Sequence, residues 1–140
     1  MSDAFKIIAE AESLIYEGKF SDAEQVLRKS LVSFANNPDI LALLAQTHIS
    51  QNDIEKASKN LDLAIQIDPS SRVVQFNYVR LLLKKSLYID ALELTKRMVK
   101  NLPSDAEALG LHGISLRANE CPADSVCFLS KAIELNPIYA

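Results

Sequence analysis

The chain has 140 residues, a formal net charge of −3, 49% hydrophobic residues and 24% charged residues. This length suits one domain or one short repeat array, and only three glycines and five prolines argue against long loops. Because charges of both signs are interspersed, the sequence lacks the basic surface by which proteins bind nucleic acid or anionic membranes. It also contains no run of 18 apolar residues, so we expect no membrane-spanning helix and no membrane partner.

The N-terminus and the cysteines favour a cytoplasmic protein. The opening residues, Met-Ser-Asp-Ala-Phe-Lys, lack the basic region and apolar stretch of a secretory signal. The two cysteines, Cys121 and Cys127, are too few for a disulfide framework and are expected to be free thiols. A fragment of an exported protein would nevertheless have the same composition.

Proline occurs at positions 69, 103 and 137, at two intervals of 34 residues. Aligned on this period, the chain divides into four windows, residues 4–37, 38–71, 72–105 and 106–139. A fixed period of this length is typical of one supersecondary unit stacked on copies of itself. We therefore expect one continuous repeat domain rather than separate domains.

Each window is predicted to hold two amphipathic helices, because its large apolar residues recur three, four or seven positions apart. We number the residues of each window from 1 to 34. Small residues at window positions 8, 20 and 27 would let the two helices approach closely. No sustained period-two alternation occurs, so no strand is expected. The small residues are Ala11, Ala23 and Ser30, then Ala45, Ala57 and Ala64, a single Ala91 between Val79 and Met98, and finally Gly113, Ser125 and Ala132.

Turn and capping residues mark the predicted helix ends in chain order. Turns between the two helices of a window are expected at Gly18, at Asn52-Asp53 and at Ser86, and the first window should end at 36–38. Asn37 and Asp53 are the predicted N-caps of the helices that follow them. Pro122 fits a first helical turn, where its missing N–H costs nothing, and Pro69, Pro103 and Pro137 should each end a second helix.

The pattern resembles the tetratricopeptide repeat, which has two helices per 34 residues, these small positions and a proline at position 32. The resemblance covers residues 4–139 and implies an all-α fold: a right-handed α-solenoid of about eight helices in antiparallel pairs. Its concave face would be lined by the first helix of each window. The aromatic residue usual at position 4 is absent throughout, and His48 stands where tyrosine is common in the second window.

The sequence offers no catalytic constellation and no cofactor or metal site. His48 and His112 fall at packing positions of predicted helices, and a metal would need three or four converging ligands. Cys121 and Cys127 are six residues apart, which places them on different faces of a helix. The three scattered glycines cannot form a phosphate-binding loop. We therefore expect a protein that is not an enzyme.

The resemblance implies that positions 2, 5, 9, 12 and 13 of each first helix face the concave groove, and many of them are apolar here. Such a lining is typical of an interaction site, and basic side chains in its C-terminal half could hold a carboxylate. Phe76→Glu would then abolish binding without unfolding the array. The predicted peptide-binding groove comprises Phe5, Ile8, Glu12, Ile49, Val73, Phe76, Arg80, Leu83, Lys84, Ile114 and Arg117.

One activity known in the family, clamping the C-terminal carboxylate of cytosolic heat-shock chaperones, is not expected. The clamp positions hold no basic residue, and Glu12 would repel the acidic tail. The residues at these positions are Ile8, Glu12, Leu43, Val73 and Asn77.

The sequence thus favours a non-enzymatic interaction module that binds a protein or peptide in an apolar groove. One alternative is the N-terminal repeat region of a larger enzyme, such as a glycosyl- or sulfotransferase. Another is self-association, because no polar helix follows to cover the last repeat. That edge would include Ile138 and the face around Val126 and Ile133. Of the two explanations for the missing cap, we favour a fragment of a longer protein over an edge covered by another copy.

Overall fold

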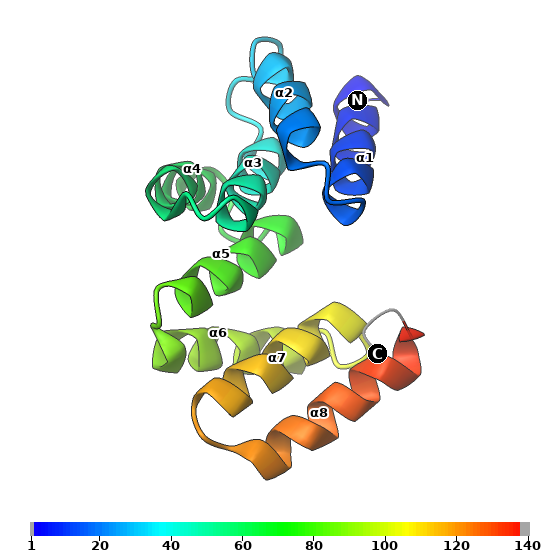
Figure 1. The fold of residues 1–140 in the computed structure, drawn as a ribbon, viewed down its shortest axis with the longest axis vertical. Coiled ribbons are helices and arrows are strands. Elements are labelled where there is room, and N and C mark those ends of the chain that lie inside the picture. Colours follow the sequence, from blue (N-terminus) through cyan, green and yellow to red (C-terminus); the bar gives the residue numbers. More distant parts are fainter. Residues whose placement is uncertain (1, 138–140) are drawn as a thin grey trace. The chain divides into compact units, whose positions relative to one another are not determined.

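The computed structural model describes residues 2–137, in which eight α-helices and no strand are present, so the predicted all-α fold is confirmed. The chain forms two compact units, unit 1 (Met1–Leu81) and unit 2 (Leu82–Ala140). In chain order the helices are α1 (Ser2–Tyr16), α2 (Phe20–Ser30), α3 (Pro38–Ser50), α4 (Ile54–Ile67), α5 (Arg72–Lys84), α6 (Tyr88–Asn101), α7 (Ala106–Ala118) and α8 (Pro122–Leu135) (Figure 1).

The turns after α1, α3, α5 and α7 share one backbone geometry. In each turn the residue at window position 15 has a positive φ: 78° at Gly18, 62° at Asn52, 61° at Ser86 and 62° at Glu120. The next residue donates its N–H to the carbonyl five residues earlier, for example from Lys19 to Leu14 at 2.9 Å. This pairing is the Schellman motif, which closes the C-terminal end of a helix. Glycine adopts this φ without strain, whereas the other three residues carry a Cβ.

The predicted N-caps and proline positions are confirmed, with one change in the first window. Asn37 Oδ1 accepts from the N–H groups of Asp39 and Ile40, and Asp53 Oδ1 accepts from that of Lys56. Pro122 is the first residue of α8, and α4, α6 and α8 each end two residues before a proline. The helix α2 ends at Ser30, before a run of turns at 31–36, so its end lies well before the predicted break at 36–38.

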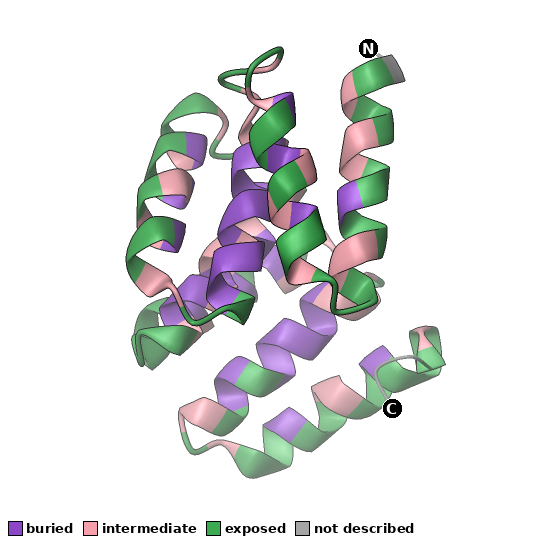
Figure 2. Cartoon of the chain, turned by 45° about the horizontal axis from the view of Figure 1, so that its top comes forward, coloured by how far each residue is buried: buried purple, intermediate pink, exposed green. Residues whose placement is uncertain are grey.

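In unit 1 the core is built around α3, of which only one flank reaches the surface. Figure 2 shows the buried residues running along most of this helix. On one side Ile40, Leu43 and Leu44 pack with Leu27 of α2 and Ala11 of α1. On the other side α3 shares a second cluster with α4 and α5, which includes Leu41, Ala45, Leu61, Ala64 and Val74. The small residues Ala11, Ala45, Ala57 and Ala64 are all fully buried, as their periodic placement predicts.

In unit 2 the same role falls to α7, which packs against α6 and α8. Its Gly113 lies so close to α8 that an added Cβ would stand 2.7 Å from Cγ of Leu129. The carbonyl of Gly113 also accepts a hydrogen bond from Ser125 Oγ at 2.8 Å. Both residues occupy predicted small positions, so close helix approach in the fourth window follows directly from them.

The strained turn at Glu120 gives a testable expectation. A left-handed backbone costs an L-residue roughly 1–2 kcal/mol, and a glycine at this position would remove that cost. Part of this gain in stability is lost again, because glycine raises the conformational entropy of the unfolded chain. We expect Glu120→Gly to raise the free energy of unfolding by about 0.5–1 kcal/mol in urea denaturation. The matched control is Ser104→Gly, at a loop residue that does not have a positive φ. This change should lower the free energy of unfolding slightly. A loss of stability in Glu120→Gly would contradict this account of the turn.

Candidate functional site

The helix α1 presents two aromatic side chains to solvent on one face. Phe5 is 72% exposed and Tyr16 is 77% exposed, and about three helical turns separate them, with the exposed Glu12 between. Ile8 and Ile15, at the edge of this face, are half-buried and pack against the core of α1, α2 and α3. We call Phe5, Glu12 and Tyr16 the α1 face. Its two aromatic rings are exposed to solvent, on either side of the carboxylate of Glu12.

Two predicted groove anchors lie in the core, which corrects the sequence-based expectation of exposed side chains. Ile49 is 6% exposed and belongs to the cluster shared by α3, α4 and α5. Phe76 is 1% exposed, and the guanidinium of Arg72 lies 4.1 Å from the centre of its ring. The physical reason for Ile49 is that α3 has packing partners on two sides, so few of its positions remain open to a ligand.

The other predicted groove residues of α5 are partly covered or polar. Val73 is half-buried against the unit 1 core, and Arg80 is half-buried with its Nη1 donating to Asn77 Oδ1 at 3.0 Å. Leu83 is half-buried and Lys84 is exposed. Since Arg80 and Lys84 are four residues apart on one helix, they share a face.

In unit 2, the predicted groove residues Ile114 and Arg117 of α7 are both on the surface. Ile114 is 37% exposed and Arg117 is exposed. The structure thus gathers the α1 face on one helix, and it leaves the remaining surface members on α5 and α7. With Ile49 and Phe76 in the core, a single groove that joins the other nine residues stays a prediction.

The sequence held a signal for the burial of Ile49. Residues 38–50 read PDILALLAQTHIS, in which apolar residues occupy nearly every side of the helix. A helix that is hydrophobic all round is typically buried on all sides. By contrast, the α1 sequence interleaves its apolar residues with Lys6, Glu10 and Glu12, which predicts one solvated side.

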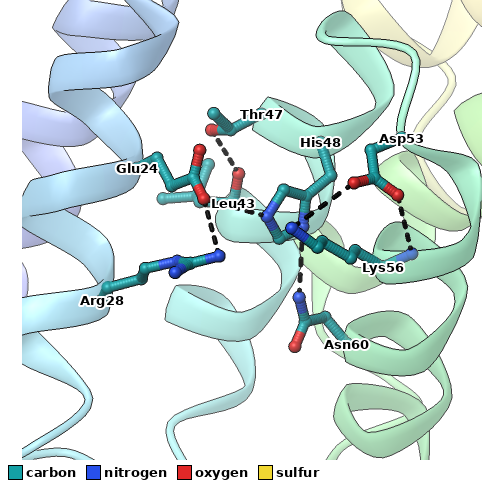
Figure 3. Close-up of polar contacts among 8 residues, drawn as sticks. All are labelled: Glu24, Arg28, Leu43, Thr47, His48, Asp53, Lys56 and Asn60. Atoms are coloured by element: carbon teal, nitrogen blue, oxygen red, sulfur yellow. Dashed lines mark hydrogen bonds and ion pairs between the residues drawn. The ribbon is translucent and has the colours of Figure 1, made fainter.

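His48 of α3 is buried, and its ring has polar neighbours on α2 and on α4 (Figure 3). Its Nδ1 lies 3.3 Å from Asn60 Nδ2, which donates, so Nδ1 is unprotonated and Nε2 carries the hydrogen. Nε2 has no hydrogen-bond partner of good geometry, and Glu24 Oε1 lies 3.5 Å away. Glu24 is in turn held by Arg28 at 2.8 Å, so His48 ties the first window to the second.

His112 makes the corresponding tie between α6 and α7, in the opposite tautomer. The hydroxyl of Thr95 donates to the carbonyl of Leu92, so its oxygen accepts from Nδ1 of His112 at 2.9 Å. The imidazole also meets the ring of Phe128 of α8 edge-on, with centroids 4.5 Å apart. Both histidines are therefore packing residues, as their helical positions predict.

Burial lowers the pKa of both histidines below the usual 6.5, because the charged imidazolium loses its hydration. For His48, the carboxylates of Glu24 and Asp53 oppose this effect on the pKa, and Arg28 adds to it. For His112, Lys96 lowers the pKa further. Neutral imidazoles are thus the forms that the folded protein prefers.

Among residues 2–137 no group of three or more His, Cys, Asp or Glu side chains could hold a metal ion. Cys121 is half-buried at the N-terminus of α8 and Cys127 is exposed on it, and both are free. None of the helices in this described range is both long and apolar enough to cross a membrane. The surface chemistry that remains is apolar contact and charged side chains of both signs.

Comparisons with known proteins agree with this repeat architecture. Residues 14–73 match the family described as tetratricopeptide repeat. A comparison with curated protein sequences gives no match. Among solved structures, the chain is similar to a thermophilic TPR protein from Thermus thermophilus, with 15% identity, a TM-score of 0.82, and 94% of this chain and 74% of that chain covered.

Two further solved structures share the fold. MamA from Desulfovibrio magneticus RS-1, from residue 41 to its end, has 21% identity and a TM-score of 0.68, covering 98% of this chain and 77% of that chain. YrrB, described as a TPR protein with an unusual peptide-binding site, has 18% identity and a TM-score of 0.66, covering 91% of this chain and 66% of that chain.

The burial of Phe76 leads to a stability prediction that replaces the binding phenotype expected from sequence. Phe76→Ala should lower the free energy of unfolding by about 3 kcal/mol, because it leaves a cavity, and Phe76→Glu should lower it more, because it buries a charge. Phe5→Ala, at an exposed ring, serves as the matched control and should cost about 0.5 kcal/mol or less. Equal losses in chemical denaturation would show that Phe76 is not a core residue.

The buried histidines predict that stability falls in mild acid. Their folded-state pKa values lie below the unfolded value of 6.5, so the unfolded chain binds protons first as pH drops. The free energy of unfolding should therefore decline as pH falls through 6.5, by at most about 1.4 kcal/mol per pH unit for each histidine. His48→Gln and His112→Gln should each flatten this slope. Greater stability at about pH 5.5 than at pH 7.5 would contradict the prediction.

Proposed function

Because this chain belongs to the tetratricopeptide-repeat family, we propose that it is a non-enzymatic protein-interaction module whose α1 face binds an apolar segment of a partner protein. The family consists in general of protein–protein interaction modules, and the fold of this chain is the family's fold. The observation that carries the proposal is the exposure of Phe5 and Tyr16 on one side of one helix. Large aromatic rings that remain in water are typical of recognition surfaces.

The chemistry of the α1 face indicates the kind of ligand. Two rings about three turns apart can pack against apolar side chains of an amphipathic helix or of an extended segment. Between them Glu12 offers a carboxylate, which favours a ligand with a basic or hydrogen-bond-donating group at that point. Ile8 and Ile15 extend the apolar floor toward the unit 1 core. The peptide-binding site in the description of YrrB supports the same kind of function in a protein of this fold.

Basic side chains on α5 and α7 offer contacts to acidic groups separately from the α1 face. Lys84 and Arg117 are exposed, and Arg80 is half-buried beside Asn77. Each of these cations suits a carboxylate of a bound segment. The absence of a basic residue at Ile8 and Val73 makes a chaperone-type C-terminal carboxylate an unsuitable ligand, and Glu12 adds repulsion.

The proposal is tested by selecting peptides from a displayed library on the immobilised chain and measuring their affinities by fluorescence anisotropy. An aromatic anchor typically carries about 2 kcal/mol, so Phe5→Ser and Tyr16→Ser should each weaken binding about thirtyfold. Both side chains are largely in water, so the variants should keep the melting temperature of the wild type.

The matched control is Val32→Ser, which changes an apolar residue that is 86% exposed in the same unit but outside the α1 face. It should bind the selected peptides as the wild type does. If Phe5→Ser and Tyr16→Ser leave every selected peptide unaffected, the α1 face is not the binding site. If instead both variants lose binding, the natural ligand can be sought in source-cell lysate. It is a partner that the wild type captures and Phe5→Ser does not.

A further inference from the structure

The second helices of the four windows, α2, α4, α6 and α8, differ in the charge of their outward faces. At window positions 21–25 the first three helices carry two ionisable residues each, whereas α8 carries no acidic or basic one. Five residues of α8, taken from these positions and position 28, form what we call the α8 face: Val126, Cys127, Leu129, Ser130 and Ile133. The charged pairs on the other helices are Glu24 and Arg28, Lys59 and Asp62, and Glu93 and Lys96.

In the earlier windows, the following helix covers the apolar part of this face. Leu27 of α2 is fully buried in a cluster with α3, and Leu61 of α4 is fully buried in a cluster that includes Val74 of α5. On α6, the equivalent Thr95 is buried and bonded to α7. On α8, in contrast, the equivalent Leu129 is only half-buried. Val126 and Ile133 are 62% and 37% exposed, whereas the residues at their positions on the other three helices are half-buried. The apolar part of the α8 face therefore remains in water among the described residues.

Window position 25 lies at the edge of these faces, and it differs between α8 and the other three helices. Arg28, Asp62 and Lys96, all at window position 25, stay exposed although a helix packs beside them. The packing of a following helix therefore leaves position 25 in solvent, where a charge is favourable. In α8 this position is Ser130, small and uncharged, so a partner can also contact the edge of the α8 face that a following helix would leave in solvent.

The other end of the chain cannot supply the partner surface. The side of α1 that corresponds to Ile40, Leu43 and Leu44 of α3 carries Lys6, Ala9 and Glu10, all exposed. Stacking that side on the α8 face would bury two charges against a surface without an ion to pair with them. A head-to-tail contact between copies is therefore unfavourable, whereas the α8 face can meet its own copy without burying any charge.

We propose that the α8 faces of two copies of this chain pack against each other about a two-fold axis that passes near Ser130, to form a closed dimer. A two-fold contact is self-complementary, so Val126 of one copy lies against residues of the same face on its partner. Ser130, a small residue beside this axis, lets the two helices approach closely. The dimer is independent of the proposed peptide binding, which rests on a helix of unit 1.

Sedimentation equilibrium of the 140-residue chain tests the dimer. The wild type should dimerise, and Val126→Glu, which places a charge on each side of the interface, should weaken the dimer about tenfold or more. The matched control is Val32→Glu on unit 1, also at an exposed valine, which should dimerise as the wild type does. A wild type that stays monomeric over the whole soluble range, or a Val126→Glu variant that dimerises normally, would overturn the proposal.

A cysteine on the two-fold axis tests the symmetry. In a Cys121→Ser and Cys127→Ser background, Ser130→Cys should oxidise rapidly to a disulfide-linked dimer, because a residue near the axis faces its own copy within bonding reach. Ser13→Cys, on the exposed side of α1, is the control and should remain monomeric. Faster cross-linking between Ser130→Cys and Ser13→Cys chains when mixed, or products larger than dimers, would overturn the two-fold contact in favour of end-to-end stacking.

Discussion

Close approach of paired helices at residues with little or no side chain is the constraint on which the structure depends. Gly113 lies so near Leu129 that one extra carbon on it would overlap that side chain. Ala11 and Ala45 are fully buried at the equivalent position of the first two windows in unit 1, and Ala64 is fully buried at another of the small positions. Because interhelical distance is set by the side chains at the contact, these positions bring the large apolar residues around them within packing distance. The side of each helix that makes this close contact also decides which residues are buried, including the two histidines, and which faces stay exposed.

Packing of this kind also explains how two histidines come to lie in the core. His48 and His112 sit where one window meets the next, and each is held by a polar side chain from a neighbouring helix. Such bonds fix the neutral ring and its tautomer, and they offset the loss of water that burial causes. The incomplete bonding of His48 Nε2, with Glu24 nearby but poorly placed, makes this junction the one most sensitive to protonation.

The same constraint decides where apolar side chains remain in water. The middle helices α3 and α7 use almost their whole surface for packing, so they offer little to a partner. On α1 and α8 the packed side is narrower, and Phe5, Tyr16 and Val126 remain exposed. These two helices thus carry the surfaces proposed for ligand binding and for dimerisation, and the two surfaces differ in chemistry: aromatic with a carboxylate on α1, and aliphatic without charge on α8.

The sequence by itself determined the period, the small buried positions, the proline ends and the caps at Asn37 and Asp53, because these depend on local backbone geometry and on spacing. It did not reveal the positive φ at Glu120, since glutamate carries no local preference for that conformation. Periodicity gives the face of a helix but not the number of its neighbours. Only the tertiary structure decided that Ile49 and Phe76 are core residues while Phe5 and Tyr16 stay in water, because burial depends on helices that come from distant parts of the chain.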